Sequence, residues 1–339
     1  MLQENALFAE TRNLEEKVCV IIPMFQVASH IQDVISGIPE WVWKIIVVND
    51  ASPDDCEEKV KELNNGRVTI LSHAHNQGVG AATLTGFNHA IDMGATIMVK
   101  MDGDNQMSPD HLEELVYPIM EGRTDYVKGN RFFHSTEILA MPFIRRLGNI
   151  GLSFLAKVAS GYWNIFDPAN GYLAIDAETF TYLDQNRISR RFYFETSMLI
   201  ELSVVRAVVA DLPIPAKYAG EESSLSIRRT ILGFPPRLLL GFLRRIWLQY
   251  FVIDFSVGSL FFIVGIILCV FGSVWGLIGW RKSILTKITA STGTVMIAVL
   301  PLILGFQLIL QAIVYDVQNV PKKVRSRISN IRDARLRGE

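Results

Sequence analysis

Two acidic residues spaced one apart, Asp102 and Asp104, follow an apolar run from Thr96 to Met101. If that run is a buried strand, the loop after it can turn both carboxylates and the side-chain amide of Gln106 toward one point. Oxygen ligands of this kind suit a hard divalent cation, with coordination positions left for water and for phosphate oxygens. The spacing therefore predicts a metal and phosphate site at the end of this strand.

The residues around the acidic pair leave one alternative open. Gly103, between the two acids, lets a ligand come close to the backbone, which favours a binding site. Pro109, however, suits the first position of a helix, and acidic residues before a helix often cap its free N–H groups. A solvated turn with two capping carboxylates is the alternative that spacing alone does not remove.

Two long segments of the 339-residue chain carry no Asp, Glu, Lys or Arg. They run from Phe255 to Trp280, 26 residues, and from Ile288 to Tyr315, 28 residues. Each exceeds the roughly 20 residues needed to cross a bilayer. Two transmembrane helices are expected, since the ordinary, polar N-terminal part gives no reason to expect a soluble core large enough to bury them.

The charges around these segments predict their orientation. Met1 to Lys17 carries four Glu and no apolar stretch, so no secretory signal is expected and the N-terminal domain stays in the cytoplasm. Cytoplasmic flanks of spans are rich in Lys and Arg, so we expect a multi-pass protein of the inner (plasma) membrane with both termini cytoplasmic. The basic residues are Arg228, Arg229, Arg237, Arg244 and Arg245 before the first span and Lys322, Lys323, Arg325, Arg327, Arg332, Arg335 and Arg337 after the second, against Arg281, Lys282 and Lys287 between them.

Composition adds little about partners. The three cysteines, Cys19, Cys56 and Cys269, have neither metal-ligand spacing nor a secreted setting, which fits a reduced compartment. We expect no nucleic-acid partner, and the sequence leaves a homo-oligomer open.

Short apolar runs alternate with helical segments through the first hundred residues. Each run is short enough to be a buried strand and ends in a polar loop that leads to a helix. This alternation predicts a parallel, doubly wound α/β sheet with ligands at the carboxyl ends of the strands. A fifth strand over Tyr126–Gly129 and an edge strand over Arg206–Leu212 are expected to extend the sheet. The four runs are Val18–Ile22, Trp43–Val48, Val68–Leu71 and Thr96–Met101.

Two of the loops hold further residues that suit a ligand. Asp50, after the second strand, can accept a hydrogen bond from a ribose hydroxyl or a base N–H, or it can cap its own turn. Gly78 and Gly80, after the third strand, can bring the backbone close to a ligand or simply form a tight strand-to-helix turn. They lack the third glycine of a dinucleotide-binding loop, so a hydride-transfer cofactor is not expected.

Two amphipathic segments are placed to meet the membrane. Met141–Tyr162, with Arg145, Arg146 and Lys157, is expected to be a helix that either packs on the sheet or contacts a lipid surface. Arg237–Phe251 places leucines and aromatics around arginines, which suits a helix in the headgroup region. We therefore expect a cytoplasmic domain over 1–226, basic juxtamembrane helices over 227–254, two spans over 255–316 and a basic cytoplasmic tail over 317–339.

Four motifs, taken in order, make the chain resemble family 2 of the inverting nucleotide-sugar glycosyltransferases, in its polyprenyl-phosphate branch. That branch is typified by dolichol-phosphate mannose synthase and bacterial undecaprenyl-phosphate glycosyltransferases. The resemblance covers about Val18 to Ile227, and the two-span tail extends it. The motifs are specific only together: Ile21-Ile22-Pro23-Met24-Phe25, Asn49-Asp50-Ala51-Ser52-Pro53-Asp54, Asn76-Gln77-Gly78-Val79-Gly80-Ala81-Ala82 and Asp102-Gly103-Asp104-Asn105-Gln106.

The resemblance implies a GT-A type, Rossmann-like domain that transfers a sugar, with inversion, from a UDP- or GDP-linked donor to undecaprenyl or dolichyl phosphate. The product would serve cell-envelope glycan assembly or modification. The resemblance also implies Mg²⁺ or Mn²⁺ on Asp102, Asp104 and Gln106, with Asp104 counted as catalytic. Donor binding would fall to Pro23, Phe25, Asp50, Gly78, Gly80, Asp102 and Gly103.

The acceptor side follows from the same resemblance. Asn130-Arg131 stands where the family has Gly-Ser-Arg, so Arg131 would be catalytic and would meet the acceptor phosphate. The chain departs from the family at Asn49, which replaces an Asp, and at Ser224, which replaces a Lys that the family often has near the phosphates. The candidates to replace that lysine are Lys217, Arg228 and Arg229.

The chemistry of a phosphate acceptor predicts little need for a general base. A phosphate monoester has a second pKa of about 6, so its attacking oxygen is already an anion at neutral pH. It needs positioning, which the fork of Arg131 can supply. Glu195 and Asp167 are the candidates for a base, and for Glu195 we favour a helix-cap or salt-bridge role.

Two other functions compete with this one. A processive or other membrane polysaccharide glycosyltransferase shares such a sheet and carboxylates, but the chain has no Gln-x-x-Arg-Trp stretch and two spans are few for an export channel. A non-catalytic membrane assembly factor would have no need of an intact acidic loop. The product formed from a labelled donor separates the three.

Overall fold

The structure is a computed structural model that describes residues 16–131, 143–214 and 227–325, and within these not the side chains of 143–147, 149 and 227–232. The predictions on Lys217 and Ser224, and on the side chains of Arg145, Arg146, Arg228 and Arg229, lie outside the described residues. The chain divides into two compact units, Met1–Phe242 with Pro321–Glu339, and Leu243–Val320. The boundary thus falls inside the segment predicted to be juxtamembrane.

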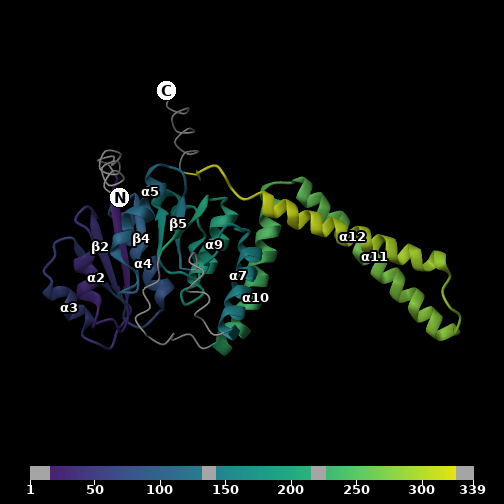
Figure 1. Cartoon of the computed structure of the whole chain (residues 1–339), viewed down its shortest axis with the longest axis horizontal. Helices are drawn as coiled ribbons and strands as arrows, with labels where there is room; N and C mark the ends of the chain where they lie inside the picture. The colour runs from purple at the N-terminus through teal and green to yellow at the C-terminus, as the bar shows by residue number, and fades with distance from the viewer. Residues whose placement is uncertain (1–15, 132–142, 215–226, 326–339) are drawn as a thin grey trace, which may run out of the picture. The chain divides into compact units, whose positions relative to one another are not determined.

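One seven-stranded sheet forms the centre of the first unit, in the order β3-β2-β1-β4-β6-β5-β7 (Figure 1). β1 to β4 are parallel, which confirms the predicted nucleus, and β7 lies parallel to β5 at the edge, as expected. β6 is antiparallel to both β4 and β5, between which it lies. The strands are β1 Val18–Met24, β2 Lys44–Asn49, β3 Val68–Ser72, β4 Ile97–Lys100, β5 Tyr126–Asn130, β6 Leu173–Asp176 and β7 Val209–Pro213.

Helices cover both faces of the sheet, which is why a central strand such as β1 is continuously apolar. All seven residues of β1 are buried. Val20 and its same-face neighbours join a core cluster with α2 (Ile31–Gly37), α3 (Cys56–Glu62) and α5 (Leu112–Met120). On the other face α4 (Val79–Asp92) comes so close that a side chain on Gly86 would collide with Ile21.

β1 continues two residues beyond its predicted end, and Pro23 lies inside it, paired with Val48 of β2. The Ile21 carbonyl accepts from the Met101 N–H on the β4 side. Backbone groups two residues apart in a strand point to the same side, so an N–H at Pro23 would point in the direction of the Ile21 carbonyl, past the end of β4. No strand of the described chain lies there to accept a hydrogen bond, so none is lost. A proline is tolerated in this central strand for that reason.

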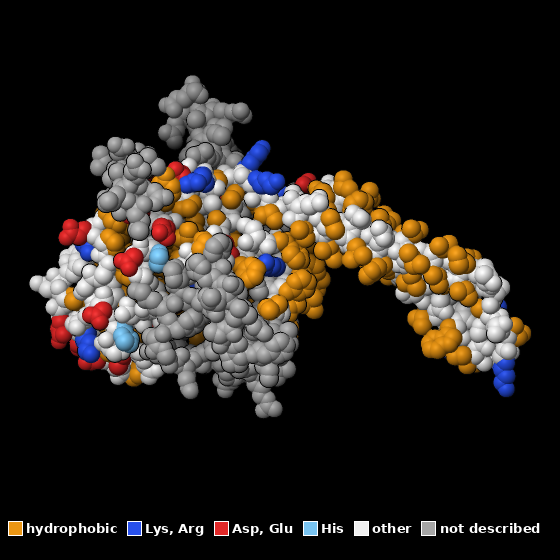
Figure 2. All heavy atoms as spheres, in the orientation of Figure 1, with side chains coloured by type: hydrophobic (Ala, Val, Ile, Leu, Met, Phe, Trp, Pro, Cys, Tyr) orange, Lys and Arg blue, Asp and Glu red, His pale blue; other side chains and the backbone are white. Residues whose placement is uncertain are grey.

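The second unit contains a hairpin of two long helices, α11 (Val257–Thr286) and α12 (Thr292–Gln318). Ser256 and Ser259 form a capping box at the start of α11, and the Ser291 side chain caps α12. Their most apolar windows have mean hydropathies of 2.6 and 2.4, and only 11% and 17% of those windows are buried. Figure 2 shows hydrophobic side chains over most of the visible hairpin surface. The two predicted membrane spans are therefore present as helices of sufficient length with apolar surfaces facing outward.

A buried ion pair closes the open end of this hairpin. Arg245, at the end of α10 (Ile227–Trp247), forks onto Asp316 of α12 at 2.7 and 2.9 Å. The Tyr250 hydroxyl donates to the same carboxylate at 2.7 Å from the short π-helix η3 (Leu248–Ile253). The segment before the first span and the end of the second are thereby joined.

The chain returns to the first unit after α12. Val324 is buried there, and the backbone N–H of Arg325 donates to both oxygens of Asp125, just before β5. The Arg325 guanidinium also donates to the Val205 carbonyl, after α9 (Phe194–Val204). The remaining described elements are η1 Pro109–His111, α7 Phe143–Ser160, α8 Ala177–Thr181 and η2 Gln185–Arg187.

Candidate functional site

The acidic loop begins where β4 ends, at the carboxyl edge of the parallel strands. The Asp102 side chain is 32% exposed, and Asp104 is half-buried with its Oδ1 accepting from the Gln106 N–H at 3.1 Å. Neither acid caps a helix, because Ser108 takes the N-cap position of η1. The helix-capping part of that alternative is therefore wrong, whereas a turn in which Asp104 accepts from a backbone N–H is present. Gly103 is buried, and a side chain there would press on Val27 at 3.2 Å, so this glycine serves packing within the loop.

Lys100, the last residue of β4, is the partner of Asp102 that we did not foresee. Its side chain is 1% exposed, and its Nζ lies 2.6 Å from Asp102 Oδ1 and 3.6 Å from a carboxylate oxygen of Glu195. It also donates to the Gly171 carbonyl at 3.3 Å. Burial opposes the charge, but the two carboxylates outweigh it and the pKa of Lys100 is raised. A lysine within an apolar strand was the signal in the sequence.

Gly171 packs directly against this pair. A Cβ at this position would lie 2.5 Å from Lys100 Nζ and 2.8 Å from Asp102 Oδ2. No side chain fits there while Asp102 and Lys100 keep their positions.

Asp50 lies in the loop after β2, as predicted, and is 2% exposed. Its two oxygens accept from the backbone N–H groups of Gln77 and Gly78 at 2.9 and 2.7 Å, and His73 Nδ1 lies 2.7 Å from Oδ1. Burial opposes the charge, but these hydrogen bonds outweigh it and the pKa of Asp50 is lowered. Asp50 therefore joins the loops after β2 and β3, and contact with a nucleoside stays a prediction.

Gly78 and Gly80 approach the protein's own backbone closely. A Cβ on Gly78, whose φ is +100°, would lie 2.6 Å from the Arg190 carbonyl, and one on Gly80 would collide with the Ser189 carbonyl. The Ala81 N–H donates to Arg190 O at 3.0 Å. The glycines thus let residues 189–191 dock on α4, and this segment leads into α9, whose first turn carries Glu195.

Glu195 is buried, and the structure places it in a salt bridge with Lys100. This is the alternative that we favoured for Glu195. The pairing also explains how a carboxylate is accommodated inside the protein, since a buried charge without a partner is costly.

Arg131 and Asp167, assigned to different roles, form one pair. The Arg131 Nε and Nη2 donate to the two oxygens of Asp167 at 2.8 and 3.3 Å. Asp167 is 1% exposed, whereas the Arg131 side chain is 37% exposed. Asn130 donates to Asp211 of β7 at 3.1 Å. Asp167 therefore orients the guanidinium of a partly exposed side chain, and binding of a phosphate by Arg131 stays a prediction.

A second buried lysine, Lys128 of β5, was likewise not among the residues predicted for the site. Lys100 and Lys128 both pair in register with Leu173, from opposite sides of β6, so their side chains lie on the same face. Lys128 Nζ donates to the Asn170 carbonyl. Burial lowers the pKa of Lys128 to about 8, although Glu195 and Asp167 oppose this shift. Lys100 and Lys128 therefore lie with Asp102 and Glu195 around the carboxyl end of β4.

The donor set fits a divalent cation. Asp102 and Asp104 offer partly exposed carboxylate side chains, and the missing side chain of Gly171 lets Asp102 keep its position. Among the described residues no three His, Cys, Asp or Glu side chains form a ready cluster, so ligands beyond the two acids would come from Gln106, water and substrate. Of the other donor-site candidates, Pro23 is buried in β1 and Phe25, just beyond it, is 43% exposed.

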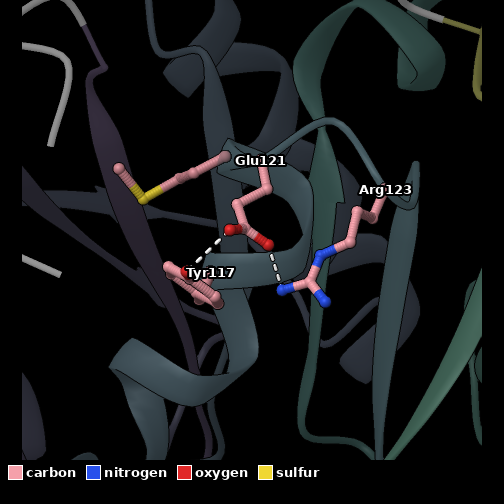
Figure 3. Close-up of a pocket in the computed structure, with 4 residues that line it drawn as sticks. Tyr117, Glu121 and Arg123 are labelled. Atoms are coloured by element: carbon pink, nitrogen blue, oxygen red, sulfur yellow. Dashed lines mark hydrogen bonds and ion pairs between the residues drawn. The ribbon is translucent and has the colours of Figure 1, made fainter. Parts of the chain in front are cut away.

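A hollow near the amino end of β5, away from the carboxyl ends of the strands, contains none of these residues. It is lined by Tyr117, Met120, Glu121 and Arg123, at the end of α5 (Figure 3). Glu121 accepts from the Tyr117 hydroxyl at 2.6 Å and pairs with Arg123. Arg123 precedes β5, which runs in the same direction as β4, so this hollow lies far from the carboxyl ends. Its polar groups bind one another, and we assign it no role.

Comparison with known proteins gives a family for this arrangement. Residues 19–197 match the model of the family described as Glycosyl transferase family 2. The UDP-N-acetylglucosamine–dolichyl-phosphate N-acetylglucosaminyltransferase of Methanococcus voltae is 28% identical over 235 residues, 65% of this chain and 93% of that protein. The undecaprenyl-phosphate mannosyltransferase of Micrococcus luteus is 25% identical over 173 residues, 50% of this chain and 70% of that protein.

A solved structure is similar in fold. Glucosyl-3-phosphoglycerate synthase from Mycobacterium tuberculosis, in complex with Mn²⁺, uridine diphosphate and its product, superposes with a TM-score of 0.52 at 18% identity, covering 70% of this chain and 82% of that one. This likeness and the family match confirm the expected GT-A type fold.

Proposed function

The chain belongs to glycosyl transferase family 2, and we propose that it transfers a sugar, with inversion, from a nucleotide-sugar donor to a membrane polyprenyl phosphate. One observation carries the proposal. The partly exposed Asp102 and Asp104 lie at the carboxyl edge of β4, in a chain that also bears two outward-facing apolar helices long enough to cross a membrane. Relatives named as dolichyl- and undecaprenyl-phosphate sugar transferases support the acceptor class.

On the donor side, Asp102, Asp104 and Gln106 would hold Mg²⁺ or Mn²⁺ beside the diphosphate of a UDP- or GDP-sugar. The ion would supply Lewis-acid stabilisation of the charge that grows on the leaving diphosphate. Asp50 holds the loop at Gln77 and Gly78 in place, and the exposed Phe25 is available to the nucleoside. Lys100, which also pairs with Glu195, holds Asp102 in position.

On the acceptor side, the partly exposed side chain of Arg131 would bind the lipid phosphate, with Asp167 holding its orientation. The attacking phosphate oxygen is already an anion at neutral pH, so no general base is required. Attack in line with the leaving diphosphate inverts the anomeric centre. Asp167 and Glu195 are both engaged with cations, which favours their positioning roles over proton transfer.

The chain's connectivity favours both termini on one side of the membrane. The polypeptide leaves the first unit before α11 and re-enters it after α12, where the Arg325 N–H donates to Asp125. A hairpin of two spans does the same. The Lys and Arg distribution then favours the cytoplasm, where nucleotide sugars are available.

The decisive experiment is a product analysis. The full chain in detergent micelles is incubated with Mn²⁺, polyprenyl phosphate and a panel of radiolabelled UDP- and GDP-sugars. A lipid-extractable labelled product that is labile to mild acid is expected with one donor. A polymeric product would indicate a polysaccharide synthase, and no product with any donor would indicate a non-catalytic protein.

Two aspartates provide the matched test of the metal site. Asp104→Ala should abolish turnover without loss of folding, because a half-exposed loop carboxylate contributes little packing. Asp92→Ala is the control, since Asp92 is exposed at the end of α4, at the opposite edge of the sheet. Activity of Asp104→Ala equal to that of Asp92→Ala, in the presence of a chelator, would refute the assignment.

A further inference from the structure

The ammonium of Lys100 contacts the same carboxylate, that of Asp102, that a divalent cation would bind. Its Nζ is 2.6 Å from Asp102 Oδ1, which is direct ion-pair contact with a residue assigned to the metal. The side chain is 1% exposed, so the ammonium is shielded from solvent in this position. A positive charge this close to Asp102 repels a second cation and reduces the carboxylate's attraction for it.

Glu195 offers Lys100 a second carboxylate partner. Its carboxylate oxygen lies 3.6 Å from the same Nζ, beyond hydrogen-bond distance but within the range of an ion pair. A lysine has a flexible stem, so a small rotation exchanges the closer partner without exposing the ammonium. Gly171 adds a carbonyl at 3.3 Å, which accepts from the ammonium in the observed position.

We propose that Lys100 is a resident counter-ion of Asp102 that competes with the divalent cation, and that Glu195 draws Lys100 aside when the cation binds. The inference rests on the proposed metal-dependent transfer and makes Lys100 and Glu195 positioning residues of that site. In the free enzyme Lys100 neutralises Asp102, so the cation alone binds weakly. The cation binds tightly once the donor diphosphate adds its own negative charge, which couples cation binding to donor binding.

The test measures Mn²⁺ binding without turnover. Free Mn²⁺ is followed by electron paramagnetic resonance in the full chain in detergent micelles, with and without UDP or GDP. Binding that Asp104→Ala removes is assigned to the site. Lys100→Met keeps the length and loses the charge, and Lys44→Met is its control, because Lys44 lies at the start of β2, at the opposite edge.

The two positioning residues should change Mn²⁺ affinity in opposite directions. Lys100→Met should tighten the binding of Mn²⁺ alone by about tenfold or more and reduce the gain that the diphosphate brings. Glu195→Gln should weaken the binding of Mn²⁺ alone severalfold. Of its two carboxylate partners, Lys100 then keeps only Asp102, and so it stays closer to the carboxylate that the cation needs. In the double variant the effect of Glu195→Gln should disappear, since Glu195 acts through Lys100.

Several results would overturn the proposal. A merely structural lysine would weaken Mn²⁺ binding when replaced. An equal effect of Glu195→Gln with and without Lys100 would make Glu195 act on the ion directly. Loss of UDP and GDP affinity in chelator on Lys100→Met would make Lys100 a diphosphate ligand. If Lys100→Met does not fold, tighter or unchanged Mn²⁺ binding by Glu195→Gln is sufficient to reject the idea.

Dependence of Mn²⁺ binding on Asp104 separates the metal site itself from the role of Lys100. Absence of any Mn²⁺ binding that depends on Asp104, even with UDP or GDP present, would remove the metal site itself. Binding that depends on Asp104 but is unchanged in Lys100→Met would leave the metal site intact and reject only the role of Lys100.

Discussion

Gly171→Ala is the substitution whose effect on the site can be worked out most directly from the structure. The added Cβ would lie 2.5 Å from Lys100 Nζ and 2.8 Å from Asp102 Oδ2, against 3.4 Å for an ordinary contact. The ammonium must therefore move by about 0.9 Å and the carboxylate oxygen by about 0.6 Å. Both atoms are side-chain ends, so the backbone can keep its place while the proposed metal ligand is displaced.

The expected cost falls on activity more than on stability. A misplacement near 1 Å costs a reacting site about a hundredfold, so we expect kcat to fall about 10- to 100-fold. Overpacking of this size lowers the free energy of unfolding by about 1–3 kcal/mol. The assay is turnover of the labelled donor at a series of Mn²⁺ concentrations, with thermal melting measured in parallel.

Gly66→Ala is the matched control, because a Cβ on Gly66 meets nothing within 4 Å. It should keep both turnover and melting temperature. The reasoning is refuted if Gly171→Ala melts like the parent and turns over at the parental rate with the same Mn²⁺ requirement, because Asp102 would then have moved without consequence.

Three further predictions concern stability. Asp50→Ala should lower the free energy of unfolding by about 2–4 kcal/mol in urea titrations, because two N–H groups lose a charged acceptor. The folded-state pKa of Asp50 is lowered, so in the parent this contribution is present above pH ~4 and is lost in stronger acid. The parent's stability should rise from about pH 8 to about pH 10.5, where the unfolded chain binds the proton that folded Lys128 has lost, and Lys128→Met should lack this rise. Asp316→Asn should destabilise the two-helix hairpin by about 3 kcal/mol, because Arg245 is left buried without its counter-charge, as thermal melting in detergent can measure.

Each of these has an outcome that contradicts it. Urea curves of Asp50→Ala that match the parent at pH 7 would show that the loop needs no carboxylate. A rise in stability between pH 8 and 10.5 that survives in Lys128→Met would assign it to another group. An unchanged melting temperature in Asp316→Asn would show that Arg245 finds other partners.

Local patterns in the sequence were sufficient to predict the strands of the parallel nucleus and the two long C-terminal helices. The strands of the nucleus were predicted within two residues, because a buried parallel strand needs a short, continuous apolar run bounded by polar loops. The two long helices followed from length and absence of charge. The acidic loop was singled out because two carboxylates follow an apolar strand, although spacing alone also allowed two capping residues in a solvated turn. Each of these signals is carried by neighbours in the chain.

The tertiary structure decided which charged groups meet. Asp50 turned out to hold the Gln77–Gly78 loop, and Arg131 to pair with Asp167, 36 residues away. The short antiparallel strand β6 separates β4 from β5 and so brings Lys100 and Lys128 to either side of Leu173. No local periodicity encodes that insertion. Ion pairs between distant residues depend on strand order and register, and these are set by the packing of the whole sheet.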